Sequence, residues 1–261
     1  MRLSVAAANI AMGVIYVTLG CMAIADLRRE RAIRGFSHFG LAFIALAFTC
    51  GPHHLEHGLH VAFGGRQGGP LDLVAVLVGV PAGVAWFLLR IEARRGGRGD
   101  RFVSGTPRWL RALPVLAAFY LVVLAAGFVA VARSGADLVP RLTPNVLLIG
   151  LYGLIGYYLS RTQLANRTPL GGWSLSGMAL TLVFPTCALM HAVYVLYASV
   201  GRYDVEAHGL VIDWLSVPAA IYFVWVVRSL YLGAFRDWNE GATGAQPEVA
   251  GARREMAGAP A

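Results

Sequence analysis

The sequence predicts an all-α integral membrane protein with seven transmembrane helices. Of its 261 residues, 57% are hydrophobic and only 14% are charged, and the mean hydropathy is +0.61. Such a composition is typical of a chain that lies mostly in lipid. Apolar stretches long enough to cross about 30 Å of hydrocarbon cover residues 4–25, 36–62, 71–90, 112–132, 144–160, 174–200 and 210–233.

The first apolar stretch is too long for a signal peptide, so we interpret it as a retained span. Orientation follows from the arginines. Seventeen of the 22 basic residues lie in or directly next to the connections 26–35, 91–111 and 161–173 or near the C-terminal end, and five lie on the opposite side. Because basic residues concentrate on the cytoplasmic side, we expect the N-terminus outside and the C-terminus inside. The localisation expected is multi-pass in a cell membrane, the bacterial plasma membrane.

The charge pattern excludes several classes of protein. The net charge of +8 comes from arginine alone, because the chain has no lysine, and this excludes a retinal Schiff base. The arginines form short runs between apolar stretches and no single basic face, so we expect no nucleic-acid partner. Three cysteines make no disulfide framework. Residues 237–261 are rich in Gly, Ala and Pro, which predicts a disordered cytoplasmic tail without room for a kinase domain.

Two parts of the chain resemble each other. A shift of 137 residues aligns Ser37 with Ser174, Gly40 with Gly177, Cys50 with Cys187, His54 with His191 and Pro81 with Pro218, and a shift of 136 aligns Asn9 with Asn145 and Tyr16 with Tyr152. These matches predict a 3+1+3 parallel internal repeat whose copies pack about an axis along the membrane normal. The units are a first three-helix repeat (1–95), an inner loop and linking helix (96–140), a second three-helix repeat (141–236) and the tail (237–261).

Cysteine and histidine stand four residues apart in both copies. This spacing places them one turn apart on one helix face. The pseudo-symmetry of the copies would gather two thiolates and two imidazoles, a set that suits Cu(I) or Zn(II). The predicted metal ligands are Cys50, His54, Cys187 and His191. Further polar residues continue outward along the second stretch, as supports for the ligands or an access path for the metal: His53, Glu56, His57 and His60.

Other readings of these residues stay open. A membrane histidine can simply hydrogen-bond a neighbouring helix, and Cys50 and Cys187 could form a disulfide. Two histidines, His54 and His191, could instead ligate a haem b, and the pseudo-twofold axis could be a transport path for a solute or metal. A metal hydrolase with Glu56 as base ranks last. Near the outer ends of two stretches, Asp72 and Asp213 could be helix caps or functional acids.

The stretch Cys50-Gly51-x-x-His54-Leu55, after Asn9-x6-Tyr16 on the first span, resembles the transmembrane domain of ethylene receptors and their bacterial relatives. In that family the Cys and His hold a copper(I) ion that binds ethylene, and the receptor is a dimer. The resemblance implies that the second copy supplies the other half of such a dimer within one chain. It implies a ligand pocket formed by Asn9, Tyr16, Asn145 and Tyr152.

The chain departs from the family pattern at three points. Asparagine replaces the family's acidic residue on the first helix of both copies, and Ala188 replaces the glycine in the second copy. The sensor-kinase output has no counterpart, so a signal would pass to a separate protein at the cytoplasmic face. The leading expectation is a non-enzymatic membrane Cu(I)-binding protein that senses a small uncharged, ethylene-like ligand or handles copper, with the lipid bilayer around it.

Overall fold

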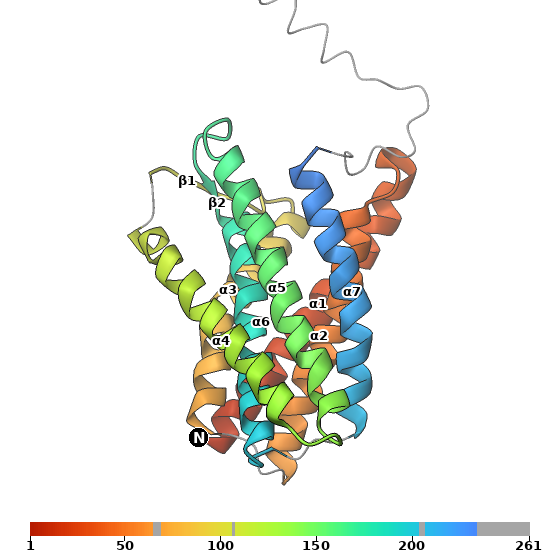
Figure 1. Ribbon diagram of the computed structural model, residues 1–261. Helices are drawn as coiled ribbons and strands as arrows, with labels where there is room; N and C mark the ends of the chain where they lie inside the picture. The colour runs from red at the N-terminus through yellow and green to blue at the C-terminus, as the bar shows by residue number, and fades with distance from the viewer. Residues whose placement is uncertain (65–68, 106–107, 204–206, 234–261) are drawn as a thin grey trace, which may run out of the picture.

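The computed structural model describes residues 1–64, 69–105, 108–203 and 207–233, and this part of the chain forms a bundle of seven α-helices (Figure 1). The helices are α1 (Arg2–Arg34), α2 (His38–Phe63), α3 (Pro70–Arg94), α4 (Leu113–Arg133), α5 (Val139–Asn166), α6 (Leu175–Ser199) and α7 (Ala207–Tyr231). A short 3-10 helix covers Arg108–Ala112, and two strands, β1 (Phe102–Val103) and β2 (Trp173–Ser174), pair with each other. The tail predicted over 237–261 lies outside the described residues.

Six of the seven helices are long and apolar enough to cross a membrane, which indicates a multi-pass membrane protein. The exception is α2, whose second half carries four histidines and Glu56. Its polar residues are covered by other helices, because α2 packs between α1 and α7, and His54 and His57 are buried. The seven predicted stretches therefore all occur as helices, and the least apolar of them holds the polar centre of the bundle.

Successive helices run up and down, so the bundle has two distinct ends (Figure 1). The N-terminal end holds residue 1 and the connections α2–α3, α4–α5 and α6–α7. The sheet end holds the connection α1–α2, the strands β1 and β2, and the end of α7. The strands are antiparallel and pair Phe102 with Ser174 and Val103 with Trp173, a contact that the sequence did not predict.

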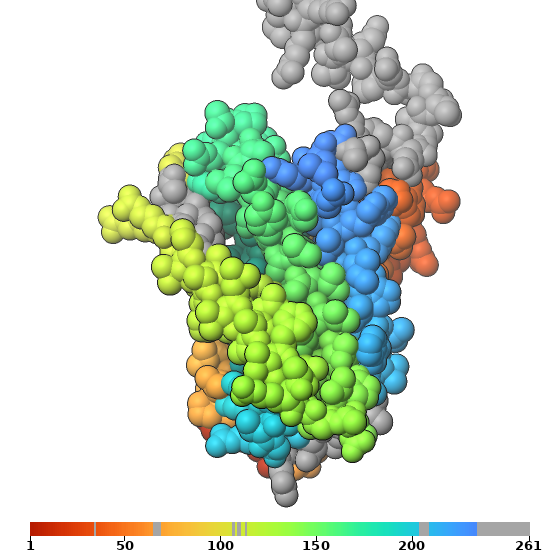
Figure 2. Space-filling view, viewed as in Figure 1, coloured from red at the N-terminus to blue at the C-terminus, as the bar shows by residue number. Residues whose placement is uncertain are grey.

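Helix contacts fall into matching pairs. Helix α1 packs on α2 as α5 packs on α6, and α1 touches α3 as α5 touches α7. Between the first three and the last three helices, α2 packs on α7 and α3 packs on α6. Helix α4 lies outside this set against α5 and α6 and exposes apolar side chains along its length (Figure 2). Such an apolar helix surface is suited to contact with the lipid hydrocarbon.

The N-termini of α2 and α6 are capped in the same way. The side-chain oxygen of Ser37 accepts a hydrogen bond from the backbone N–H of Gly40, and that of Ser174 accepts one from Gly177, both at 2.8 Å. Serine at the N-cap satisfies a helix N–H that has no partner within the helix. Asp100 accepts hydrogen bonds from the Ser174 hydroxyl and the Ser176 N–H, which ties the loop after α3 to the start of α6.

Glycines bring α1 and α2 into backbone contact. A Cβ on Gly51 would lie 2.7 Å from Val17 Cγ2 and 3.1 Å from the Val17 nitrogen, and one on Gly58 would lie 3.0 Å from the Ala6 carbonyl oxygen. Small residues at such crossings allow membrane helices to approach closely. This approach lets Asn9 of α1 reach His54 of α2, whose facing atoms lie 2.9 Å apart.

Candidate metal centre

Three polar side chains from different helices meet near the centre of the bundle. His53 (α2), His191 (α6) and Asp213 (α7) each place a potential ligand atom within 4.8 Å of those of the other two. His53 Nδ1 lies 2.9 Å from Asp213 Oδ1, and the two imidazole centroids are 4.9 Å apart. Within the described residues no other three His, Cys, Asp or Glu side chains gather this closely. We call these three residues the metal cluster.

Asn145 of α5 orients two members of the metal cluster. Its amide nitrogen donates a hydrogen bond of 2.7 Å to Asp213 Oδ2, so its oxygen is the atom that faces His191 Nδ1 at 2.7 Å. An amide oxygen only accepts hydrogen bonds, so His191 Nδ1 must carry the proton. The lone pair of His191 Nε2 is then available for a metal, which is how a supporting group usually fixes a histidine ligand.

A related contact lies in the first three helices. The amide nitrogen of Asn9 donates to the Val5 carbonyl oxygen at 3.0 Å, and its oxygen lies 2.9 Å from His54 Nδ1. The proton therefore sits on His54 Nδ1 for the same reason. The two asparagines differ in the acceptor of their amide N–H: Asn9 donates to a backbone carbonyl, whereas Asn145 donates to a carboxylate. With a shift of 137 residues, the residue aligned with Asp213 is Val76. The first three helices therefore have no carboxylate at the position that corresponds to Asp213.

The two cysteines each contact a tyrosine from the opposite half of the bundle. Cys50 Sγ lies 2.8 Å from the Tyr152 hydroxyl, and Cys187 Sγ lies 3.5 Å from the Tyr16 hydroxyl. Each tyrosine ring also meets a histidine of its own half edge-on, Tyr16 with His54 and Tyr152 with His191. Both thiols are free, so the structure does not contain the disulfide considered from the sequence.

Of the four ligands predicted from the sequence, His191 alone belongs to the metal cluster. Cys50, Cys187 and His54 do not form a comparably close group with it. His53, expected to support the ligands or line an access path, contributes an imidazole to the metal cluster. Helices α2 and α6 meet there through side chains, while α2 packs mainly on α1 and α7 and α6 packs mainly on α5 and α3.

Asp213 is the residue that sequence reasoning left undecided. It lies inside α7, which begins at Ala207, and it is 3% exposed. Its carboxylate binds His53 and Asn145, so it is no N-terminal cap. Asp72, the other candidate, does cap α3, because its Oδ2 accepts a hydrogen bond of 2.9 Å from the Gly69 N–H. The signal for Asp213 was its position within an apolar span, where an acid indicates function by default.

The remaining outward residues of α2 lie toward the N-terminal end. His57 is buried and lines a chamber next to the metal cluster. Glu56 lies near Gly209 at the start of α7, and His60 is in the last turn of α2. That this end faces outside, and that these residues form an access path, both stay predictions.

No protein-family model, curated protein or solved structure matches this chain.

Proposed function

We propose that this membrane protein binds copper at His53, His191 and Asp213. The observation that carries the proposal is the metal cluster, in which ligand atoms from α2, α6 and α7 lie within 4.8 Å of one another. Imidazole suits copper among the first-row metals, and two imidazoles with a carboxylate offer three ligands to a copper ion. The His53–Asp213 contact at 2.9 Å is the interaction that a metal ion would replace.

The surrounding sulfur atoms favour copper over other first-row metals. Cys50 and Cys187 lie one helical turn from His54 and His191 and contact the tyrosines that pack on those histidines. Thiolates select Cu(I). The Cu(I) site expected from the sequence, with Cys50, His54, Cys187 and His191 as ligands, is the second candidate, and it requires each thiol to leave its tyrosine.

Paired contacts support the proposed 3+1+3 parallel repeat. The serine caps, the Asn–His pairs and the Tyr–Cys pairs each occur once in α1–α3 and once in α5–α7, or reciprocally between them. The helix packing follows the same pairing. With the N-terminus outside, as the arginines predict, the metal cluster lies in the outer half of the membrane and is loaded from outside.

Metal analysis of the protein purified in detergent tests the proposal. After incubation with excess copper and passage through a desalting column, we expect at least one copper ion to remain bound per chain in the presence of competing Zn(II). The haem b alternative predicts a strong visible absorption band in the purified protein instead. Protein that retains no copper above the level of an empty-detergent control would remove the proposed function.

The resemblance to ethylene receptors extends the proposal to a sensory role. Bound Cu(I) would then take up a small uncharged ligand, and a separate protein at the sheet end would receive the signal. Retention of labelled ethylene by copper-loaded membranes, and its loss on copper removal, would support that role. If copper binds and ethylene is not retained, copper handling is the function that stands. A metal transporter instead predicts copper flux in proteoliposomes.

Asn145 and Asn9 provide a matched pair for locating the metal. Asn145→Leu should weaken copper binding by about 10-fold to 100-fold, the usual effect of losing a group that orients a ligand. Asn9→Leu removes the equivalent contact to His54 and should leave the affinity near that of the wild type. Competition titration with a copper chelator measures both. Equal weakening in the two variants would place the metal on His54 and His191 together and contradict the metal cluster.

A further inference from the structure

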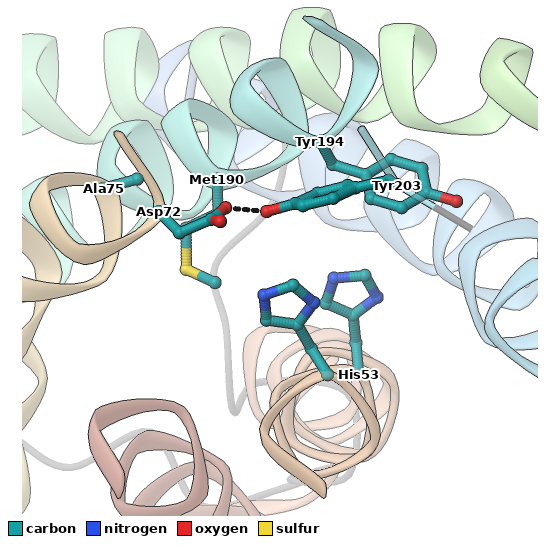
Figure 3. Close-up of a pocket in the computed structure, with 7 residues that line it drawn as sticks. His53, Asp72, Ala75, Met190, Tyr194 and Tyr203 are labelled. Carbon is teal, nitrogen blue, oxygen red and sulfur yellow. Dashed lines mark hydrogen bonds between the residues drawn. The ribbon is translucent and has the colours of Figure 1, made fainter. Parts of the chain in front are cut away.

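A chamber lies beside the metal cluster, between α2, α3 and α6 (Figure 3). It is lined by His53, His57, Asp72, Ala75, Met190, Tyr194 and Tyr203. Of these residues His53 also belongs to the metal cluster, whereas His191 and Asp213 do not line the chamber. The chamber is therefore a neighbouring space that shares one wall with the cluster.

His57 is buried in this wall without a polar partner. Its side chain belongs to a residue that is 8% exposed, and its ring stacks parallel to that of His53 with centroids 6.5 Å apart. Its other ring contact is with Tyr203 at 6.0 Å. Within the described part of the chain, neither nitrogen of His57 has a hydrogen-bond partner. An imidazole that lines the chamber and has no protein partner for its nitrogens is able to bind a ligand there.

The other lining residues indicate that this ligand is a soft cation. Figure 3 shows the Met190 side chain and the His53 imidazole projecting into the same space, and a thioether is a ligand that Cu(I) prefers. Asp72 supplies a negative charge that is held in place by the Tyr203 hydroxyl and the Gly69 N–H. Among the described residues, no arginine lines the chamber. An imidazole, a thioether and a fixed carboxylate together favour a monovalent soft metal ion over an anion.

We propose that the chamber is a second copper site, in which His57 and Met190 hold Cu(I) next to the metal cluster. The proposal rests on the copper function above. Because His53 lines the chamber and belongs to the cluster, an ion can pass between the two sites by exchange of ligands. No change of oxidation state is needed for this step. The chamber thus acts as a loading site for the metal cluster. It lies on the side of the cluster that faces Tyr203, in the connection between α6 and α7.

Anaerobic titration with Cu(I) against a coloured Cu(I) chelator tests the proposal. His57→Phe and Met190→Leu should each lower the number of bound Cu(I) ions per chain by one. Met178→Leu is the matched control, because Met178 lies on the same helix but does not line the chamber, and it should bind as the wild type does. Combining Met190→Leu with Asp213→Asn should remove two ions, one from each site.

The outcomes separate the two proposals. If His57→Phe and Met190→Leu bind as much Cu(I) as the wild type, the chamber is not a copper site, although the metal cluster stands. If Met190→Leu and Asp213→Asn remove the same single ion, the chamber belongs to the cluster and the second site is also rejected. Wild-type protein that binds no copper would overturn both proposals. Melting curves of each variant identify any loss that is caused by unfolding.

Discussion

Asp213→Asn should lower the affinity for the first copper ion by at least about 100-fold, because removing a ligand should cost more than removing a group that only orients one. The exchange keeps the size of the side chain, and the new amide oxygen can still accept a hydrogen bond from Asn145 or His53. The fold should therefore persist while the anionic ligand is lost. Chelator competition with one equivalent of copper measures the affinity.

Asp72→Asn is the matched control for this prediction. Asp72 is a second buried acid toward the N-terminal end of the bundle, 6% exposed, and it lies outside the metal cluster. Its exchange should leave the affinity for the first copper ion within about 3-fold of the wild type. Asp72 is not a ligand in the metal cluster, so its charge affects the bound ion only through screened electrostatic attraction. An Asp213→Asn variant that binds the first ion as tightly as Asp72→Asn would exclude the carboxylate as a ligand.

Gly51→Leu should produce the largest loss of stability. The new side chain would start 3.1 Å from the backbone nitrogen of Val17, an atom that cannot move without displacing α1. Overpacking of this kind costs about 1–3 kcal/mol or more, which corresponds to a fall in the melting temperature of roughly 2–12 °C. Copper binding should weaken as well, because α2 carries His53. Thermal unfolding in detergent measures the first effect.

Gly150→Leu on α5 is the control. A Cβ placed on Gly150 would have no atom from another part of the structure within 4 Å. Leucine is a better helix former than glycine, so the melting temperature should stay unchanged or rise slightly. A Gly51→Leu variant as stable as Gly150→Leu would show that α1 and α2 do not need their close approach.

The helices could be predicted from the sequence, and their ends could not. Apolar length decides whether a stretch crosses the membrane, and all seven stretches are helical. Helix α1 nevertheless continues to Arg34 beyond the predicted residue 25, and α5 continues to Asn166 beyond 160. Hydrophobicity marks where lipid ends, whereas a helix continues until a residue such as Gly35, with φ of 82°, interrupts it.

The choice between His53 and His54 shows why the site was predicted only in part. Adjacent residues on a helix point about 100° apart, so one sequence pattern offers two faces. The packing of α2 between α1 and α7 turns His54 to Asn9 and His53 to Asp213. This rotation depends on contacts between distant helices, which the Cys–His spacing does not contain.

Asp213 was not among the predicted ligands, because those four residues all occur in both copies. The residue aligned with Asp213 is Val76. The metal cluster combines one symmetric residue, His191, with two that occur in one half only. A site whose residues differ between the two predicted copies cannot be found by a comparison of those copies.

X-ray absorption at the copper edge, on protein with one equivalent of copper, tests the central claim most directly. The proposal predicts a shell of nitrogen and oxygen ligands with the outer scattering of imidazole rings, from His53, His191 and Asp213. Asp213→Asn and His53→Met should each change that spectrum. A shell dominated by sulfur at about 2.3 Å, a typical metal–thiolate distance, would place the first copper ion on Cys50 and Cys187 and contradict the metal cluster.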